Sequence, residues 1–136
     1  MIVVDTSVWI NKFRGVETSA VRMLLDIADG TKILVGDVIL LELLQGSRTE
    51  AQAQKIQRAM KTFAFDQMLN YGLAVAAARN FRTLHGLGFT VRTSVDLIVG
   101  TYCIENDHVL LHDDRDFVPM AEYLGLKLAN TAAQSS

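Results

Sequence analysis

The sequence predicts an α/β domain of three layers, with helices on both faces of a central, mainly parallel β-sheet. Its strand-like segments are short and apolar at consecutive positions, which is typical of strands buried on both faces. Longer segments with apolar residues at helical spacing separate them, and this alternation favours a parallel sheet. The 136 residues fit one domain, which we assign to residues 1–130, and we expect residues 131–136 to form a flexible tail.

Five short segments are predicted to form the strands. Residues 1–5 (MIVVD) are a β-branched run that ends in an acid, and residues 32–36 (KILVG) and 108–112 (HVLLH) are similarly apolar. Residues 65–70 (FDQMLN) have room for a brief strand, and residues 126–129 (LKLA) form the last one.

The first two predicted helices begin at polar residues and end at glycines. Residues 6–15 can be capped by Thr6 or Ser7. Residues 17–30 have apolar residues at helical spacing, and Gly30 is expected to end that helix.

Two helices are predicted in the middle of the chain. Residues 37–46 (DVILLELLQG) form a buried helix with Asp37 at its cap and Gly46 at its end. Residues 49–63 form an amphipathic helix, whose apolar side consists of Ala53, Ile56, Ala59, Met60 and Phe63.

Three helices complete the second half of the domain. Residues 71–88 are rich in alanine and closed by glycines, and residues 94–107 begin with Ser94 as the expected N-cap. Residues 117–125 form the last helix, before the final strand.

Acidic residues follow two of the predicted strands. Asp5 ends the first one, and Asp113, Asp114 and Asp116 come directly after residues 108–112. Ligands of open parallel sheets bind beyond the carboxyl ends of the strands, so these side chains are expected to meet at one edge. Like charges packed so closely repel one another unless water screens them or a cation holds them.

Two further carboxylates stand out by their surroundings. Glu42 lies in the apolar segment VILLELL, where burial without a partner would be expensive. The alternative is a narrow polar stripe, shared with Gln45. Asp96 follows the expected cap by two residues, where the helix dipole alone would stabilise an acid.

Together these acids form a set of oxygen ligands without cysteine or histidine at metal-ligand spacing. Such a set favours Mg²⁺ or Mn²⁺ over zinc. We therefore predict a magnesium or manganese site formed by Asp5, Glu42, Asp96, Asp114 and Asp116. A bound cation would explain why the aspartates can crowd together.

The sequence closely resembles the PIN-domain ribonucleases, and within them the VapC toxins of toxin–antitoxin pairs. The resemblance covers nearly the whole chain and rests on four blocks in order: VVDTSVWI, LLELLQG, VRTSVDLIVG and LLHDDRDF, before the closing YLGLKLA. It implies a PIN-like α/β/α fold and metal-dependent cleavage of RNA by water attack on a phosphodiester, which leaves a 5′-phosphate and a 3′-hydroxyl. By position, the four acids of the family match Asp5, Glu42, Asp96 and Asp114, and Asp116 matches an auxiliary one.

The same resemblance implies roles for neighbouring residues. Thr6 or Ser7 would support the site by hydrogen bonding, and Arg92 would touch phosphate or brace the acids. Asp113 stands where relatives vary, and His112 matches no family position, so we assign neither to the site.

The charge distribution is uneven although the net charge is only −2. Between Leu43 and Val95 there are seven basic and two acidic residues, so this region is basic and the rest of the chain is acidic. Within it, Lys55, Arg58 and Lys61 are spaced along one helical face, which either tracks RNA phosphates or is simply solvated. Base-stacking aromatics are few: Phe117 and Trp9 are the nearest, and Trp9 is better explained as a core residue.

Partners and location follow from the resemblance and from composition. Relatives of this type form homodimers and are inhibited by a VapB antitoxin, for which we predict an arginine or lysine inserted into the acidic pocket. Apolar residues of helices 17–30 and 49–63 could serve either contact. The lone Cys103 in an apolar segment indicates a reducing compartment, and no apolar run is long enough to span a membrane, so we predict a cytoplasmic protein.

Two other functions were weighed against ribonuclease activity. An aspartate-based phosphatase usually needs a second acid two residues after the first, where Ser7 stands, and a lysine near the pocket, which these motifs lack. A PIN scaffold that binds RNA or protein without cutting is the other alternative, and the intact acids argue against it.

Overall fold

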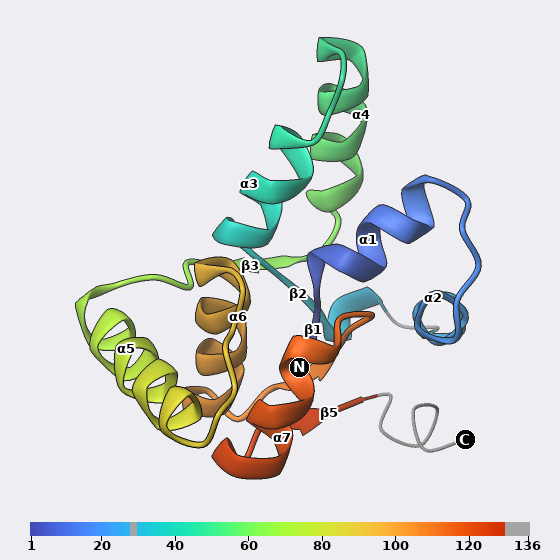
Figure 1. Cartoon of the computed structure of the whole chain (residues 1–136). Helices are drawn as coiled ribbons and strands as arrows, with labels where there is room; N and C mark the ends of the chain where they lie inside the picture. The colour runs from blue at the N-terminus through green and yellow to red at the C-terminus, as the bar shows by residue number, and fades with distance from the viewer. Residues whose placement is uncertain (28–29, 130–136) are drawn as a thin grey trace.

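The computed structural model describes residues 1–27 and 30–129, and it confirms the predicted three-layer α/β fold (Figure 1). The strands of these residues join one sheet and are, in chain order, β1 (Ile2–Val4), β2 (Ile33–Gly36), β3 (Ala64–Asp66), β4 (Val109–Leu111) and β5 (Lys127–Leu128). Their order across the sheet is β3-β2-β1-β4-β5, and all four neighbouring pairs are parallel. The predicted tail, residues 131–136, lies outside the described residues.

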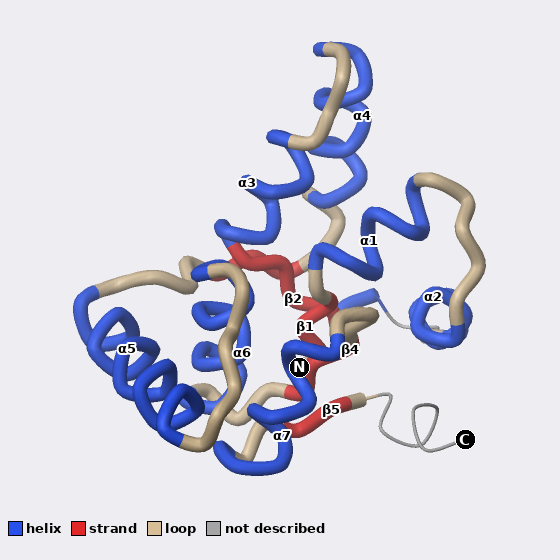
Figure 2. The backbone as a smooth tube through the Cα atoms, viewed as in Figure 1, coloured by secondary structure: helices blue, strands red, loops and turns tan. Residues whose placement is uncertain are grey.

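Helices surround this sheet, which Figure 2 shows in red at the centre of the molecule. They are α1 (Thr6–Phe13), α2 (Ser19–Asp26), α3 (Asp37–Gln45), α4 (Glu50–Met60), α5 (Tyr71–Gly86), α6 (Ser94–Glu105) and α7 (Val118–Leu124). Two short 3-10 helices, η1 (Gly30–Lys32) and η2 (Arg115–Phe117), precede β2 and α7. The α3–α4 pair projects from the body, with α1 and α2 on one side of it and α5 and α6 on the other (Figure 1).

Three of the predicted caps and one helix end are corrected. Asp5 itself caps α1, Gly36 takes the cap position before α3, and Thr93 caps α6 in place of Ser94. Helix α2 ends at Asp26, because Ile27 turns to an extended conformation and packs against the core. Residues 28 and 29, which the prediction included in this helix, are outside the described residues.

The brief strand predicted at residues 65–70 lies slightly earlier, at Ala64–Asp66. Its three residues pair with Leu34–Gly36 of β2. The chain leaves the sheet after Asp66 because the backbone N–H of Met68 donates to Asp37 Oδ1 (2.9 Å), at the start of α3. The Met68 side chain is fully buried there.

One hydrophobic core surrounds the sheet. It contains Trp9, Cys103 and Phe117, so the interpretation of Trp9 and Cys103 as core residues is confirmed. Both aromatic rings are buried, and the suggestion that Phe117 stacks on a base is therefore wrong. Among the described residues, no helix combines the length and the apolar character needed to span a membrane.

Candidate metal-binding active site

Aspartates leave the sheet together at the carboxyl ends of β1 and β4. These strands are parallel neighbours, and their pairing ends with Val4 opposite Leu111. Asp5 follows directly, and its backbone N–H donates to the Leu111 carbonyl (2.9 Å). Asp113 and Asp114 lie in the loop after β4, so the register alone brings the two sets of acids to one edge of the sheet.

The carboxylates of Asp96, Asp114 and Asp116 gather into one group. One oxygen atom of each lies within 4.8 Å of the others. Asp96 reaches the group from the first turn of α6 and is buried, whereas the other two are half-buried. Burial, followed by the negative charges of Asp5 and Asp114, raises the pKa of Asp96 to about 7. This is the spacing and chemistry of a site for a hard divalent cation.

Asp5 has one carboxylate oxygen in use and one without a partner. Oδ2 accepts from the backbone N–H of Ser7 (3.1 Å) and from its hydroxyl (2.7 Å). Oδ1 is buried and has no hydrogen-bond partner among the described residues. Burial is the main cause that raises the pKa of Asp5 to about 6, and the charge of Glu42 adds to it. A buried oxygen left unpaired is costly, and a cation would satisfy it.

Glu42 lies on α3, beside Asp5 and outside the group of three. Its Oε1 accepts a hydrogen bond of 2.6 Å from the hydroxyl of Thr6, which is itself buried. The glutamate therefore has a partner within the site, and it is only partly buried. This pairing between α1 and α3 explains how an acid is tolerated in so apolar a helix.

Arg92 holds the two half-buried aspartates from the loop before α6. Its Nε and backbone N–H donate to Asp116 Oδ2 (3.0 and 3.3 Å), and its Nη2 donates to Asp114 Oδ1 (3.3 Å). The hydrogen bond to Asp116 is the largest cause that raises the pKa of the guanidinium. Each carboxylate offers only one of its oxygens to Arg92, so the other is not taken by this contact.

Two residues orient the acids without belonging to the predicted site: Thr93, which sequence reasoning missed, and His112, which it left out of the site. Thr93 Oγ1 accepts from the backbone N–H of Asp96 (3.2 Å), and His112 Nδ1 accepts from the backbone N–H of Asp114 (3.1 Å). His112 is fully buried against the Phe117 ring, with ring centres 5.4 Å apart, and burial lowers its pKa. Thr93 precedes Asp96 by three residues and His112 precedes Asp114 by two, and this proximity in the sequence was the available signal.

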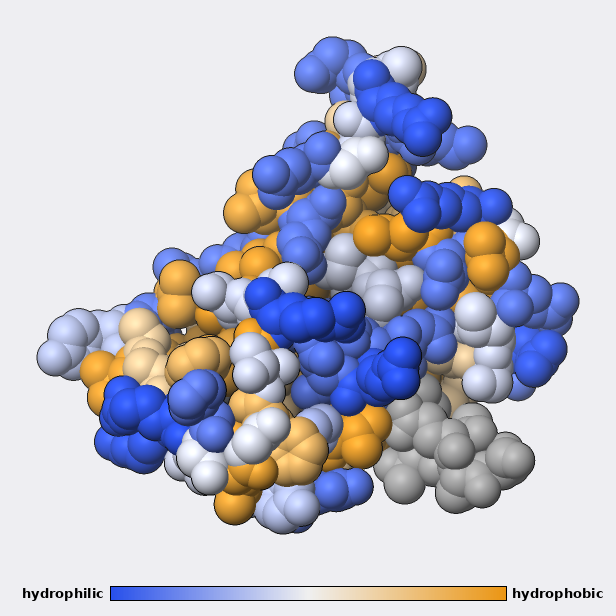
Figure 3. All heavy atoms as spheres, viewed as in Figure 1, coloured by the Kyte–Doolittle hydropathy of each residue, from blue (hydrophilic) through white to orange (hydrophobic). Residues whose placement is uncertain are grey.

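The predicted basic stripe lies away from these acids. Lys55, Arg58 and Lys61 are exposed on α4 or directly after it, and their contact with RNA stays a prediction. Figure 3 shows the hydrophilic surface of α4 above an apolar area between α1 and the α3–α4 pair. The groove there has a volume of ≈ 70 Å³ and is lined by Ile10, Phe13, Arg14, Glu42, Leu43, Gly46, Gln52 and Ile56.

The chain matches a known protein family and is similar to curated relatives along almost its whole length. Residues 2–123 match the family described as PIN domain. VapC ribonuclease Mb1587 of Mycobacterium bovis and ribonuclease VapC11 of Mycobacterium tuberculosis are each 27% identical, over 96% of this chain and 98% of theirs.

Two solved structures of VapBC proteins share the fold. VapBC2 from Rickettsia felis, bound to a promoter DNA fragment, has a chain with a TM-score of 0.73 and 19% identity, covering 94% of this chain and 97% of that one. VapBC-1 from nontypeable Haemophilus influenzae has a chain with a TM-score of 0.69 and 16% identity, covering 94% of this chain and 96% of that one.

Proposed function

The chain belongs to the PIN-domain family, and from this premise we propose that it is the toxin of a type II toxin–antitoxin pair, an endoribonuclease that requires Mg²⁺ or Mn²⁺. The ribonuclease names of its curated relatives support the activity. The observation that carries the metal requirement is the group of Asp96, Asp114 and Asp116 within 4.8 Å, beside the buried unpaired oxygen of Asp5.

Asp5, Asp96, Asp114 and Asp116 would hold the cation. When bound, a divalent ion lowers the pKa of a water molecule and stabilises the charge that develops on the phosphate. Glu42 has Oε1 occupied by Thr6, which leaves Oε2 to take the proton of the attacking water. As the water oxygen bonds to phosphorus, the bond to the 3′ oxygen breaks. That oxygen leaves, takes a proton from solvent and becomes a 3′-hydroxyl, and the phosphate stays on the 5′ end.

Arg92 would serve both the acids and the substrate. Its side chain is 69% exposed although it braces Asp114 and Asp116. The guanidinium can therefore meet an RNA phosphate at the rim of the site while it holds the two carboxylates.

The antitoxin would occupy the groove between α1 and the α3–α4 pair. The groove is lined by apolar side chains, including Ile10, Leu43 and Ile56, together with polar ones that include Glu42. A peptide that combines apolar side chains with an arginine or lysine matches this lining. The inserted cation would replace the charge of the metal among the acids, as we predicted from the sequence.

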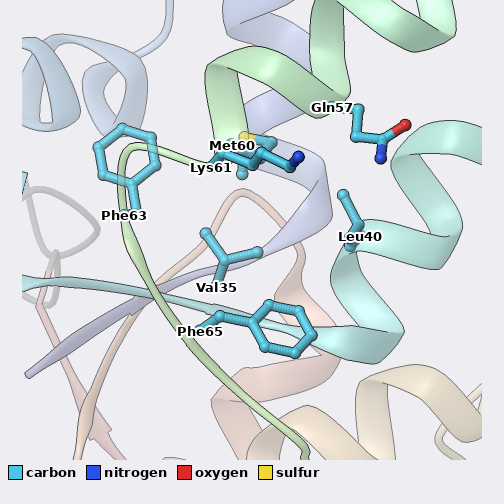
Figure 4. Close-up of a pocket in the computed structure, with 7 residues that line it drawn as sticks. All are labelled: Val35, Leu40, Gln57, Met60, Lys61, Phe63 and Phe65. Atoms are coloured by element: carbon cyan, nitrogen blue, oxygen red, sulfur yellow. The ribbon is translucent and has the colours of Figure 1, made fainter.

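A second copy of the chain would pack on the other side, along β3 and the start of α5. Phe65, Leu69, Tyr71 and Val75 are all exposed there. Next to them is an apolar hollow of ≈ 270 Å³ (Figure 4), where Phe65, Val35 and Leu40 lie below Met60 and Lys61. Unpartnered apolar surface of this kind is typical of an interface. The predicted cytoplasmic location stays a prediction.

Incubation of the purified protein with total RNA tests the activity, with Mn²⁺ or Mg²⁺ in one arm and EDTA in the other. We expect new RNA ends bearing a 5′-phosphate only when the ion is present. Asp5→Asn should abolish them, whereas Asp107→Asn, which alters an exposed acid paired with Lys127, should not. Equal cleavage by the wild type and Asp5→Asn would contradict the proposed function.

A further inference from the structure

Asp113 is the member of the crowded aspartate loop that does not join the acidic group. Its Oδ2 accepts from Asn11 Nδ2 (3.1 Å) and from Thr18 Oγ1 (2.7 Å). Both donors belong to the segment at the end of α1 and the start of α2. The side chain therefore points to the α1–α2 connection, while its neighbours Asp114 and Asp116 point to each other and to Asp96.

The backbone of the same residue contacts the site. Its N–H donates to Ser7 Oγ (3.0 Å), and the Ser7 hydroxyl donates to Asp5 Oδ2 (2.7 Å). A continuous path of hydrogen bonds thus runs from Thr18 through Asp113 and Ser7 to Asp5.

The far end of this path is fixed to α2. Thr18 is the N-cap of that helix, and its Oγ1 accepts from the backbone N–H of Val21 (3.1 Å) while donating to Asp113. The preceding connection includes Gly15, whose φ of +73° favours glycine. Helix α2 lies at the side of the molecule (Figure 1), so a specific contact is needed to relate it to the acids.

We propose that Asp113 is a positioning residue, which ties the α1–α2 connection to the acidic site and through Ser7 sets the carboxylate of Asp5 for cation binding. The inference rests on the proposed function, because it assumes that these acids bind a divalent ion. Residues that orient metal ligands without touching the metal typically change its affinity by 10–100-fold when they are altered.

Calorimetric titration with Mn²⁺ at constant pH tests the proposal. Asp113→Ala and Thr18→Val each break the path, and we expect each to weaken Mn²⁺ binding about tenfold. Asp113→Asn and Thr18→Ser keep an acceptor or a hydroxyl at the same place, and both should bind within about twofold of the wild type.

These variants distinguish a positioning role of the Asp113 hydrogen bonds from an effect of its negative charge on the bound cation. If Asp113 acts only by its negative charge, Asp113→Asn weakens binding as much as Asp113→Ala, and Thr18→Val has no effect. That result would overturn the proposal. Thr49→Val is the matched control, because Thr49 caps α4 in the same way, through Gln52, and is not part of the path. It should leave Mn²⁺ binding unchanged.

A second measurement uses the reciprocity of linked sites. Saturating Mn²⁺ should slow amide hydrogen exchange in α2 of the wild type and leave it unchanged in Asp113→Ala. Asn11→Ala provides another break in the contact if Thr18→Val does not fold. If the wild type binds Mn²⁺ and the variants bind it equally well, this inference alone is overturned. Wild-type protein without Mn²⁺ binding would overturn the proposed function and this inference with it.

Discussion

One carboxylate oxygen of Asp5 is hydrogen-bonded and the other is not, and this difference indicates the role of the residue. Oδ2 completes the cap of α1 through Ser7, which is all that a helix start requires. Oδ1 is buried without a partner in the described part of the chain. Asparagine or serine would cap the helix without a buried charge. The retained carboxylate therefore favours cation binding over a purely structural role.

Replacement of Asp5 by asparagine should stabilise the protein when no divalent ion is present. The pKa of Asp5 is raised from 3.8 to about 6, so the folded state binds this proton more tightly than the unfolded chain does. The stability that the protonated Asp5 side chain contributes is therefore lost as pH rises from about 4 to about 6. At pH 7 the asparagine should raise the free energy of unfolding by at most about 3 kcal/mol. At pH 4 or below this increase should disappear.

Urea unfolding in EDTA at pH 4 and at pH 7 measures this effect. The free energy of unfolding of Asp5→Asn should exceed that of the wild type only at the higher pH. With saturating Mn²⁺ the wild type should become the more stable of the two, since ligand binding to the folded state stabilises it. A variant less stable than the wild type at pH 7 in EDTA would contradict this account of the unpaired oxygen.

Thr6→Val tests the role of Glu42 in handling a proton. The substitution keeps the shape of the side chain and removes the 2.6 Å hydrogen bond to Glu42 Oε1. We expect the single-turnover rate of RNA cleavage to fall at least about tenfold, because the carboxylate is no longer oriented. The affinity for Mn²⁺ should change less than about twofold, and Thr6→Ser should restore the rate. Equal losses in rate and in Mn²⁺ affinity would instead make Glu42 a metal ligand.

At the scale of elements, the start of α6 connects helix capping to the chemistry of the site. Thr93 caps the helix by accepting from the backbone N–H of Asp96. Hydrogen bonding of the Thr93 side chain to the Asp96 carboxylate also lowers the pKa of the aspartate. The opposing effects of burial and of neighbouring acids are larger, so the pKa still reaches about 7. The Thr93 side chain thus favours the charged carboxylate, the form that binds a cation.

Thr93→Ala should therefore affect both stability and cation binding. Loss of an N-cap costs about 1 kcal/mol of unfolding free energy. The pKa of Asp96 should rise further, and Mn²⁺ affinity at pH 7 should fall severalfold and partly recover at pH 8. Thr49→Ala removes the cap of α4 and should cost similar stability without affecting Mn²⁺. If the two variants bind Mn²⁺ alike, capping by Thr93 has no part in the site.

The elements that could be predicted from sequence are those with strong periodic patterns. The apolar runs gave β1, β2 and β4, and the parallel connections between them brought Asp5 beside Asp114. The caps were harder, because Thr93 and Ser94 have the same capping chemistry and only the backbone decides between them. The Thr6–Glu42 and Asp113–Thr18 contacts join residues 36 and 95 positions apart, and no local pattern indicates them.

At the scale of the molecule, the exposed apolar residues include two groups in different parts of the fold. One lies at the end of α1 and on α2, where Phe13, Val16, Met23 and Leu25 are exposed. The other is the surface of Phe65, Leu69, Tyr71 and Val75 that we propose for a second copy of the chain. The surface proposed for the second copy shares no residue with the groove proposed for the antitoxin, so both contacts would be able to form at the same time.

A charge placed on each surface in turn should separate the two contacts. Tyr71 is 87% exposed, so Tyr71→Glu is expected to leave the fold intact and to break the proposed dimer by burying an unpaired carboxylate. Light scattering with size-exclusion chromatography should show a dimer for the wild type and a monomer for Tyr71→Glu. Met23→Glu on α2 is the control and should remain dimeric. A monomeric Met23→Glu with a dimeric Tyr71→Glu would mean that the α1–α2 surface holds the second copy, and the proposed dimer surface would be wrong.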